Sequence, residues 1–158
     1  MSLEGRRFLV SGTVLGQPIG GVHRHNAQLL PRVARLLSER GASLSVLEGR
    51  EPIEFELPDS VERVRTEVPA GPPLSRALAE GPALRRELAR ARRSGSPYTA
   101  VHWAHFPVPR GLDLPLTVTL HDLRRLSRGN SNYSRYLQRL CDTLNPQIIK
   151  ETQTCVAC

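Results

Sequence analysis

The stretch RFLVSGTVLGQPIGGVHRHN, residues 7–26, decides the fold class that this chain is expected to adopt. The continuous apolar run at residues 8–10, bounded by glycine, is typical of a strand buried on both faces of a parallel sheet. A glycine-rich loop follows, and a second apolar run, LSVL at 44–47, predicts another strand. Residues 8–47 therefore predict a strand–helix–strand unit, the right-handed crossover of parallel sheets.

The segment between these strands predicts a helix over residues 22–40, and Gly41 supplies its stop. Pro31 interrupts the pattern, so the helix either kinks there or begins anew with this proline in its first turn. The expected apolar face carries Val22, Leu29, Leu30, Val33, Leu36 and Leu37.

The rest of the chain continues the alternation of strands and helices. Residues 51–69 alternate and contain proline, which predicts an edge strand or an extended connection. A helix is expected over residues 74–93, divided at Gly81-Pro82, and strands are expected over 98–106 and 116–120. The expected apolar side of that helix carries Leu74, Leu78, Leu84 and Leu88. This order predicts an α/β, Rossmann-like fold, with a mostly parallel sheet and helices on both faces.

Composition limits the classes of function. The chain of 158 residues has a net charge of +7, and 21 of its 22 basic residues are arginines. This charge permits binding to phosphates or to an anionic membrane surface. The arginines are scattered and have few aromatic neighbours, which argues against nucleic acid. We see neither a signal peptide nor an apolar run of about 20 residues, so we expect a cytoplasmic protein, with a peripheral contact at the inner face of the membrane as an option.

The composition changes near Gly129. Three of the four asparagines, the single lysine and all three cysteines lie beyond it. We therefore divide the chain into a Rossmann-like part, residues 1–129, and a segment 130–158. The latter is either a helix and terminal strand of the same domain or a foreign, frame-shifted tail. Cys155 and Cys158 form a single CxxC pair without a second pair, so we predict no metal site.

Three loops are expected at the carboxyl ends of parallel strands, where ligands of such sheets bind. They carry Gly20-Gly21, followed by Arg24, then His105, and finally His121-Asp122. Two glycines before a helix can expose backbone N–H groups to a phosphate, although they can also simply form a loop. His121 can donate to a sugar hydroxyl or to developing negative charge while Asp122 orients it; alternatively, Asp122 caps a helix and His121 packs.

The same segments argue against a nicotinamide cofactor. The glycines do not follow the pattern GxGxxG, and Glu48 is the only acidic residue near the end of the second expected strand. We therefore predict no cofactor.

Three segments in order resemble the large family of GT-B-fold retaining glycosyltransferases that includes sucrose and mannosyl transferases. They are IGGVHRHNAQLLPRVARLLSERGASLSVLEG at 19–49, AVHWAHFPVP at 100–109 and LPLTVTLHDLRRL at 114–126. They are similar to the family's opening GGV turn, its third-loop segment and its HDL strand end. The resemblance runs from about Phe8 to Leu126. Ala42 departs from it, because the family often has a histidine after the RG turn.

The resemblance implies a role for each loop. Gly20 and Gly21 would lie beside the diphosphate of a sugar nucleotide, which is a donor substrate. His121 would be the catalytic residue near the transferred sugar, with Asp122 and His105 as further substrate ligands. Arg24 would help bind an acidic or phosphorylated acceptor.

The resemblance also implies a second Rossmann-like domain, with an E-x7-E element, for which this chain has no room. We therefore expect a truncated or partnered half of an enzyme, inactive alone. The competing expectation is a non-catalytic module that docks on a partner chain or an anionic membrane surface.

Overall fold

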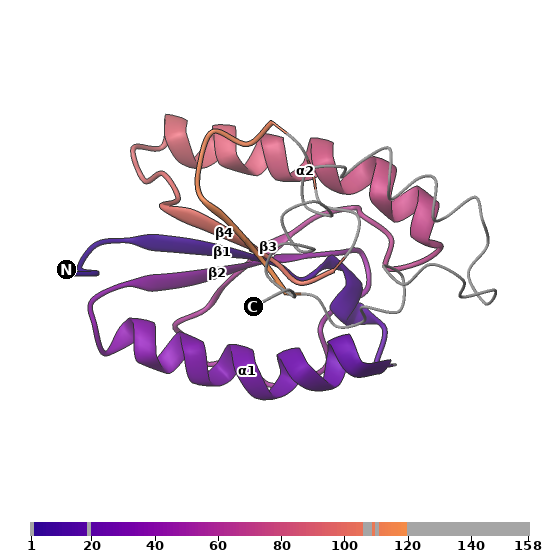
Figure 1. The fold of residues 1–158 in the computed structure, drawn as a ribbon, viewed down its shortest axis with the longest axis horizontal. Helices are drawn as coiled ribbons and strands as arrows, with labels where there is room; N and C mark the ends of the chain where they lie inside the picture. Colours follow the sequence, from indigo (N-terminus) through magenta and orange to yellow (C-terminus); the bar gives the residue numbers. More distant parts are fainter. Residues whose placement is uncertain (1, 19, 106–108, 110, 120–158) are drawn as a thin grey trace, which may run out of the picture.

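Five parallel strands form one sheet in the computed structural model of the chain, which describes residues 2–18, 20–105, 109 and 111–119 (Figure 1). The strands follow the order β3-β2-β1-β4-β5, and every pairing between neighbours is parallel. Their bounds are Arg7–Ser11 for β1, Ser43–Glu48 for β2, Glu62–Arg65 for β3, Ala100–Trp103 for β4 and Leu116–Val118 for β5. The predicted α/β fold with a parallel sheet is confirmed.

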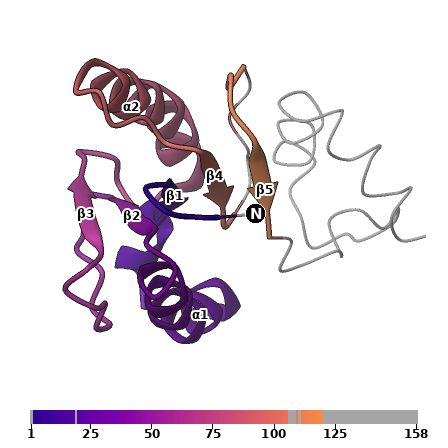
Figure 2. The same cartoon turned by 90° about the vertical axis from the view of Figure 1, so that its left-hand side faces the viewer.

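Two helices cover opposite faces of this sheet, as Figure 2 shows along its edge: α1 at Gly20–Ser38 and α2 at Pro73–Arg93. A short 3-10 turn, Thr13–Gly16, joins β1 to α1. Each helix packs against its face of the sheet through a separate layer of buried, mostly apolar side chains. The α1 layer is built on Val10, Leu15, Leu30, Ala34, Leu44, Val46, Ile53 and Val61. The α2 layer is built on Leu9, Leu47, Leu84, Leu88, Ala91, Tyr98, Val101 and Trp103.

Helix α1 is one unbroken element that includes Pro31, so the alternative of a helix restarting at this proline is wrong. The lost backbone hydrogen bond is tolerated because the same turns bury Asn26, Leu30 and Ala34 against the sheet. Leu36, which was expected on the apolar face, is exposed.

Helix α2 is also unbroken, and the predicted division at Gly81-Pro82 is wrong. Pro82 lies on the exposed side, where water can satisfy the carbonyl group that loses its partner. The predicted apolar side is correct only in its second half. Leu84 and Leu88 are buried, whereas Leu74 is exposed and Leu78 is 70% exposed. In the first half of α2 the buried face carries polar side chains instead.

The two strands expected after α2 are present but shorter than predicted. Strand β4 ends at Trp103, and β5 ends at Val118. The ring of His102 in β4 bonds to the hydroxyls of Thr117, at 2.8 Å, and Thr119, at 3.1 Å. Strand β3 forms the other edge of the sheet, as the proline-containing segment predicted.

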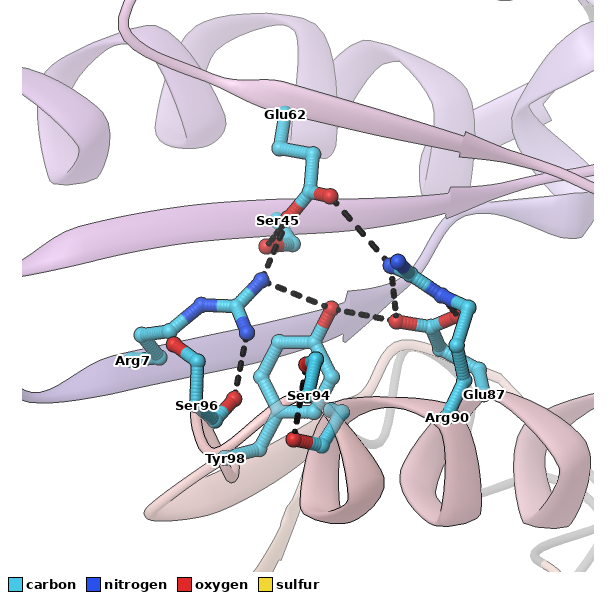
Figure 3. Close-up of polar contacts among 9 residues, drawn as sticks. Arg7, Ser45, Glu62, Glu87, Arg90, Ser94, Ser96 and Tyr98 are labelled. Atoms are coloured by element: carbon cyan, nitrogen blue, oxygen red, sulfur yellow. Dashed lines mark hydrogen bonds and ion pairs between the residues drawn. The ribbon is translucent and has the colours of Figure 1, made fainter.

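A network of charged side chains ties the edge strand β3 to β1 and α2 (Figure 3). The Glu62 carboxylate accepts from Arg7 at 2.5 Å, from the Ser45 hydroxyl at 2.8 Å and from Arg90 at 3.3 Å. The guanidinium of Arg7 also lies 4.5 Å from the centroid of the Tyr98 ring. These contacts lie over the amino-terminal half of the sheet and serve the fold.

Within the described part of the chain, no helix is both long and apolar enough to cross a bilayer. The predicted boundary at 129/130, the helix and strand expected beyond it and all three cysteines lie outside the described residues.

Candidate functional site

The order of the strands defines one special point on the sheet, between β1 and β4. From β1 the chain passes through α1 to β2 on one side, whereas from β4 it passes to β5 on the other. Ligands of open parallel sheets bind at such a switch point, outside the carboxyl ends of the strands. We call residues 12–18, 20–24 and 104–105, which follow β1 and β4 there, the switch-point edge.

Gly20 and Gly21 begin α1 at this edge, and their backbone is open. Gly20 has a φ of +89°, which favours glycine, and both residues are exposed. Apart from its chain neighbours and the backbone of α1 itself, a Cβ atom at either position would meet no atom of the described residues within 4 Å. The first turn of α1 contains no acidic residue, so nothing in it competes for the helix N–H groups. This geometry suits an anion, as the phosphate interpretation of the sequence requires.

Arg24 lies one turn into α1 and is exposed. Its side chain makes no ion pair among the described residues. Its neighbour His23 is different, because its ring packs edge-on against Phe55 with 5.5 Å between ring centroids. The first turn of α1 therefore offers one cation to solvent.

A buried polar cluster lies on the α2 side of the switch-point edge and consists of Thr13, Arg76, Glu80 and His105. We call it the Glu80 cluster. The Nε2 atom of His105 lies 2.8 and 3.1 Å from the two carboxylate oxygens of Glu80. The hydroxyl of Thr13 donates to the same carboxylate. Glu80 is only 2% exposed, so these donors replace water around its charge.

Arg76 completes the cluster from one turn earlier on α2. Its Nε atom lies 4.0 Å from Oε1 of Glu80, and its Nη1 donates to the backbone carbonyl of Ala70. The guanidinium thus joins the start of α2 to the connection that precedes it. Its positive charge also offsets part of the cost of burying the Glu80 carboxylate.

The ring of His105 contacts Trp103 as well as Glu80. Its ring stacks on that of Trp103, with 5.4 Å between centroids and 29° between planes. Its Nδ1 atom is buried and has no hydrogen-bond partner among the described residues. The side chain is only 5% exposed. The role of His105 as a substrate ligand stays a prediction, and the structure adds that this histidine is a buried, oriented group rather than a surface one.

The carboxylate of Glu48, at the end of β2, is used by its own chain. Its Oε1 accepts from the backbone N–H of Ile53 at 2.7 Å and from Arg63 at 3.1 Å, and Arg65 lies 3.5 Å from Oε2. The residue is almost fully buried. A ribose-binding carboxylate has to face the ligand, and Glu48 instead closes the turn that follows β2.

The structure brings four of the predicted site residues to one edge of the sheet. Gly20, Gly21 and Arg24 lie at the start of α1, and His105 follows β4, so all four belong to the switch-point edge. His121 and Asp122 lie outside the described residues.

Sequence analysis missed Thr13, Arg76 and Glu80. A signal was present on α2: Arg76 and Glu80 continue the spacing of the buried Leu84 and Leu88 toward the helix start.

A groove of about 410 Å³ lies elsewhere on the molecule, between the second half of α2 and residues 111–113. Arg85, Arg92 and Arg93 line it together with Leu88 and Leu112, among others, and Arg92 lies 3.9 Å from the carboxylate of Asp113. It contains none of the predicted site residues and is separate from the switch-point edge.

The fold and this edge define the chain as a Rossmann-like α/β domain with an open switch point. No protein-family model, curated protein or solved structure matches the chain. Function is therefore argued from the site itself.

Proposed function

We propose that the chain is the acceptor-side half of a glycosyltransferase that transfers a sugar from a sugar nucleotide to an acceptor. The observation that carries the proposal is the open start of α1 at the switch-point edge. A diphosphate needs backbone N–H donors that it can approach closely, and side chains at Gly20 and Gly21 would stand in its way. Among the described residues, other than the chain neighbours and the backbone of α1, no atom lies within 4 Å of where a Cβ would stand at either glycine.

The other residues take the roles that the family resemblance implies. Arg24, exposed one turn further along α1, would attract an acidic or phosphorylated acceptor. His121 is proposed as the catalytic residue and Asp122 as a substrate ligand. No metal is part of the proposal, because helix dipoles and basic groups would offset the charge of the leaving diphosphate.

Transfer between two substrates requires both to be held across a cleft, which contributes much of the catalysis. The proposal therefore includes a second domain or partner chain, and we expect the chain alone to be inactive. It places the chain in the cytoplasm, with any membrane contact peripheral.

Amide spectra of the ¹⁵N-labelled chain, titrated with UDP-glucose, GDP-mannose and inorganic pyrophosphate, test the proposal. We expect the shifts to concentrate on residues 20–24. Gly21→Asp should weaken binding by roughly tenfold or more, because a carboxylate beside the diphosphate repels it. An acidic residue in the first turn favours a helix, so lost folding would not explain this result. Gly21→Asn is the matched neutral control and should bind more tightly than Gly21→Asp.

Two outcomes contradict the proposal. The first is the absence of any shift at residues 20–24 with all three probes at millimolar concentration. The second is substantial sugar-nucleotide turnover by the chain alone, which would refute the half-enzyme idea. Salt-sensitive sedimentation with phosphatidylglycerol vesicles, without any effect of sugar nucleotides, would favour the binding module instead.

A further inference from the structure

Burial of the Glu80 carboxylate costs free energy, because the charge loses its contact with water. The residue lies on the buried face of α2, one turn before the buried Leu84. A buried carboxylate is stable only when donors surround it. Thr13 supplies one donor from the loop after β1, and His105 supplies another from the loop after β4. Glu80 therefore joins both sides of the switch point.

The contacts determine which nitrogen of His105 carries a proton. Both oxygens of Glu80 lie within 3.1 Å of Nε2, and an ionised carboxylate can only accept. Nε2 is then the donor, and in the neutral imidazole the lone pair lies on Nδ1. Stacking on Trp103 keeps the ring from turning over.

We infer that Glu80 is a positioning residue: through the Thr13–Glu80–His105 hydrogen bonds it fixes His105 as the Nε2–H tautomer and leaves the buried Nδ1 as a hydrogen-bond acceptor beside the switch-point edge. Nδ1 is buried and has no donor among the described residues. A buried acceptor of this kind is costly to leave unmatched. A hydroxyl group of the substrate is the class of donor that would match it, and this last step rests on the proposed function.

Long-range ¹H–¹⁵N spectra of the chain labelled at its five histidines test the inference without any ligand. His105→Gln assigns the signals. We expect His105 to show a single Nε2–H tautomer at neutral pH, with a ring proton that exchanges slowly. Glu80→Met keeps the volume but removes the acceptor, and should speed exchange of this proton by roughly tenfold or more.

Two further variants keep the test decisive if Glu80→Met fails to fold. Thr13→Val removes one donor at nearly constant volume and should shift the ¹⁵N resonance of Nε2 while leaving the tautomer unchanged. Glu87→Gln is the matched control, since Glu87 is a buried carboxylate on the same face of α2 that bonds to Tyr98 and Arg90 instead. It should lower stability and leave the His105 signals unchanged.

Three results would overturn the inference. They are a proton on Nδ1 of His105 in the parent chain, His105 signals unaffected by both Glu80→Met and Thr13→Val, or an equal disturbance by Glu87→Gln. Failure of the proposed function has a different signature, because sugar nucleotides would then leave residues 20–24 unchanged while the tautomer of His105 remained as stated.

Discussion

Replacing Tyr98 by phenylalanine removes one hydroxyl from the charge network that joins β1, β3 and α2 (Figure 3). This hydroxyl donates to Oε1 of Glu87 at 2.8 Å, and Tyr98 is only 8% exposed. A hydrogen bond to a charged group contributes about 1.5–3 kcal/mol. Glu87 keeps two bonds to Arg90, at 2.7 and 2.8 Å, so the loss should lie near the lower end. We expect Tyr98→Phe to lower the free energy of unfolding by about 1.5–2 kcal/mol at pH 8.

The titration of the same hydroxyl makes the free energy of unfolding depend on pH in the alkaline range. Burial first, and then the hydrogen bond and negative charge of Glu87, raise the pKa of Tyr98 to about 12 from its ordinary value of 10.0. The unfolded chain releases this proton near pH 10, whereas the folded chain retains it. The stabilising contribution is therefore complete below pH 10 and is lost as the pH rises to about 12. A difference of two pKa units corresponds to at most about 2.7 kcal/mol.

Urea unfolding at pH 8, 10, 11 and 12, followed by the fluorescence of the single tryptophan, measures both effects. The free energy of unfolding of the parent chain should fall steeply above pH 10. Near pH 12 the parent chain and Tyr98→Phe should have nearly the same free energy of unfolding. Absorbance at 295 nm should show one late-titrating tyrosine that the variant lacks. Ser96→Ala is the control, because Arg7 bonds to the backbone carbonyl of Ser96 rather than to its hydroxyl. Equal stability of parent and Tyr98→Phe at pH 8, or the same loss above pH 10 in both, would refute this reasoning.

Three further substitutions test the fold at other points. Gly16→Ala should destabilise the chain by about 2–3 kcal/mol in urea unfolding, because its Cβ would lie 2.3 Å from the carbonyl oxygen of Glu51. Gly21→Ala, where the space is open, should be neutral or slightly stabilising. Burial acts to raise the pKa of Glu62, but a serine hydroxyl and two arginines outweigh it and hold the pKa below 4.5. The contribution of Glu62 is thus present above about pH 4.5 and lost below it, and Glu62→Gln should flatten the acid side of the stability curve. The effect should stay under about 1 kcal/mol, because the Glu62 side chain is 45% exposed.

Strands β1 and β2 could be predicted because each contains a short apolar run bounded by glycine or charge. The runs at 8–10 and 44–47 lie inside β1 and β2, and the alternation of strands and helices implied the parallel sheet. The ends of β4 were less predictable. The apolar and aromatic residues that continue from Tyr98 to Phe106 suggest a longer strand, whereas pairing with β5 covers only Val101–Trp103.

The buried face of α2 could not be predicted from hydrophobicity. Leu74 and Leu78 belong to one helical stripe and Glu80 to another, and a sequence pattern favours burial of the leucines. The structure does the opposite, exposing Leu78 and burying Glu80 at the switch-point edge. Long-range contacts are the reason, because the partners of Glu80 are 67 and 25 residues away along the chain. The open glycines of α1 were visible in the sequence because their conformation depends on local backbone alone.

The two buried carboxylates of α2 differ in how their charge is compensated, and this difference separates fold from site. Glu87 has a guanidinium bonded through two nitrogens at 2.7 and 2.8 Å, an arrangement that repays much of its desolvation. Glu80 has a hydroxyl and an imidazole as its bonded donors, and the nearest contact to Arg76 is 4.0 Å. For stability alone the arrangement around Glu87 is the better one. The arrangement around Glu80 is the one that orients a histidine, and it lies at the edge of the sheet where a Rossmann-like domain binds its ligand.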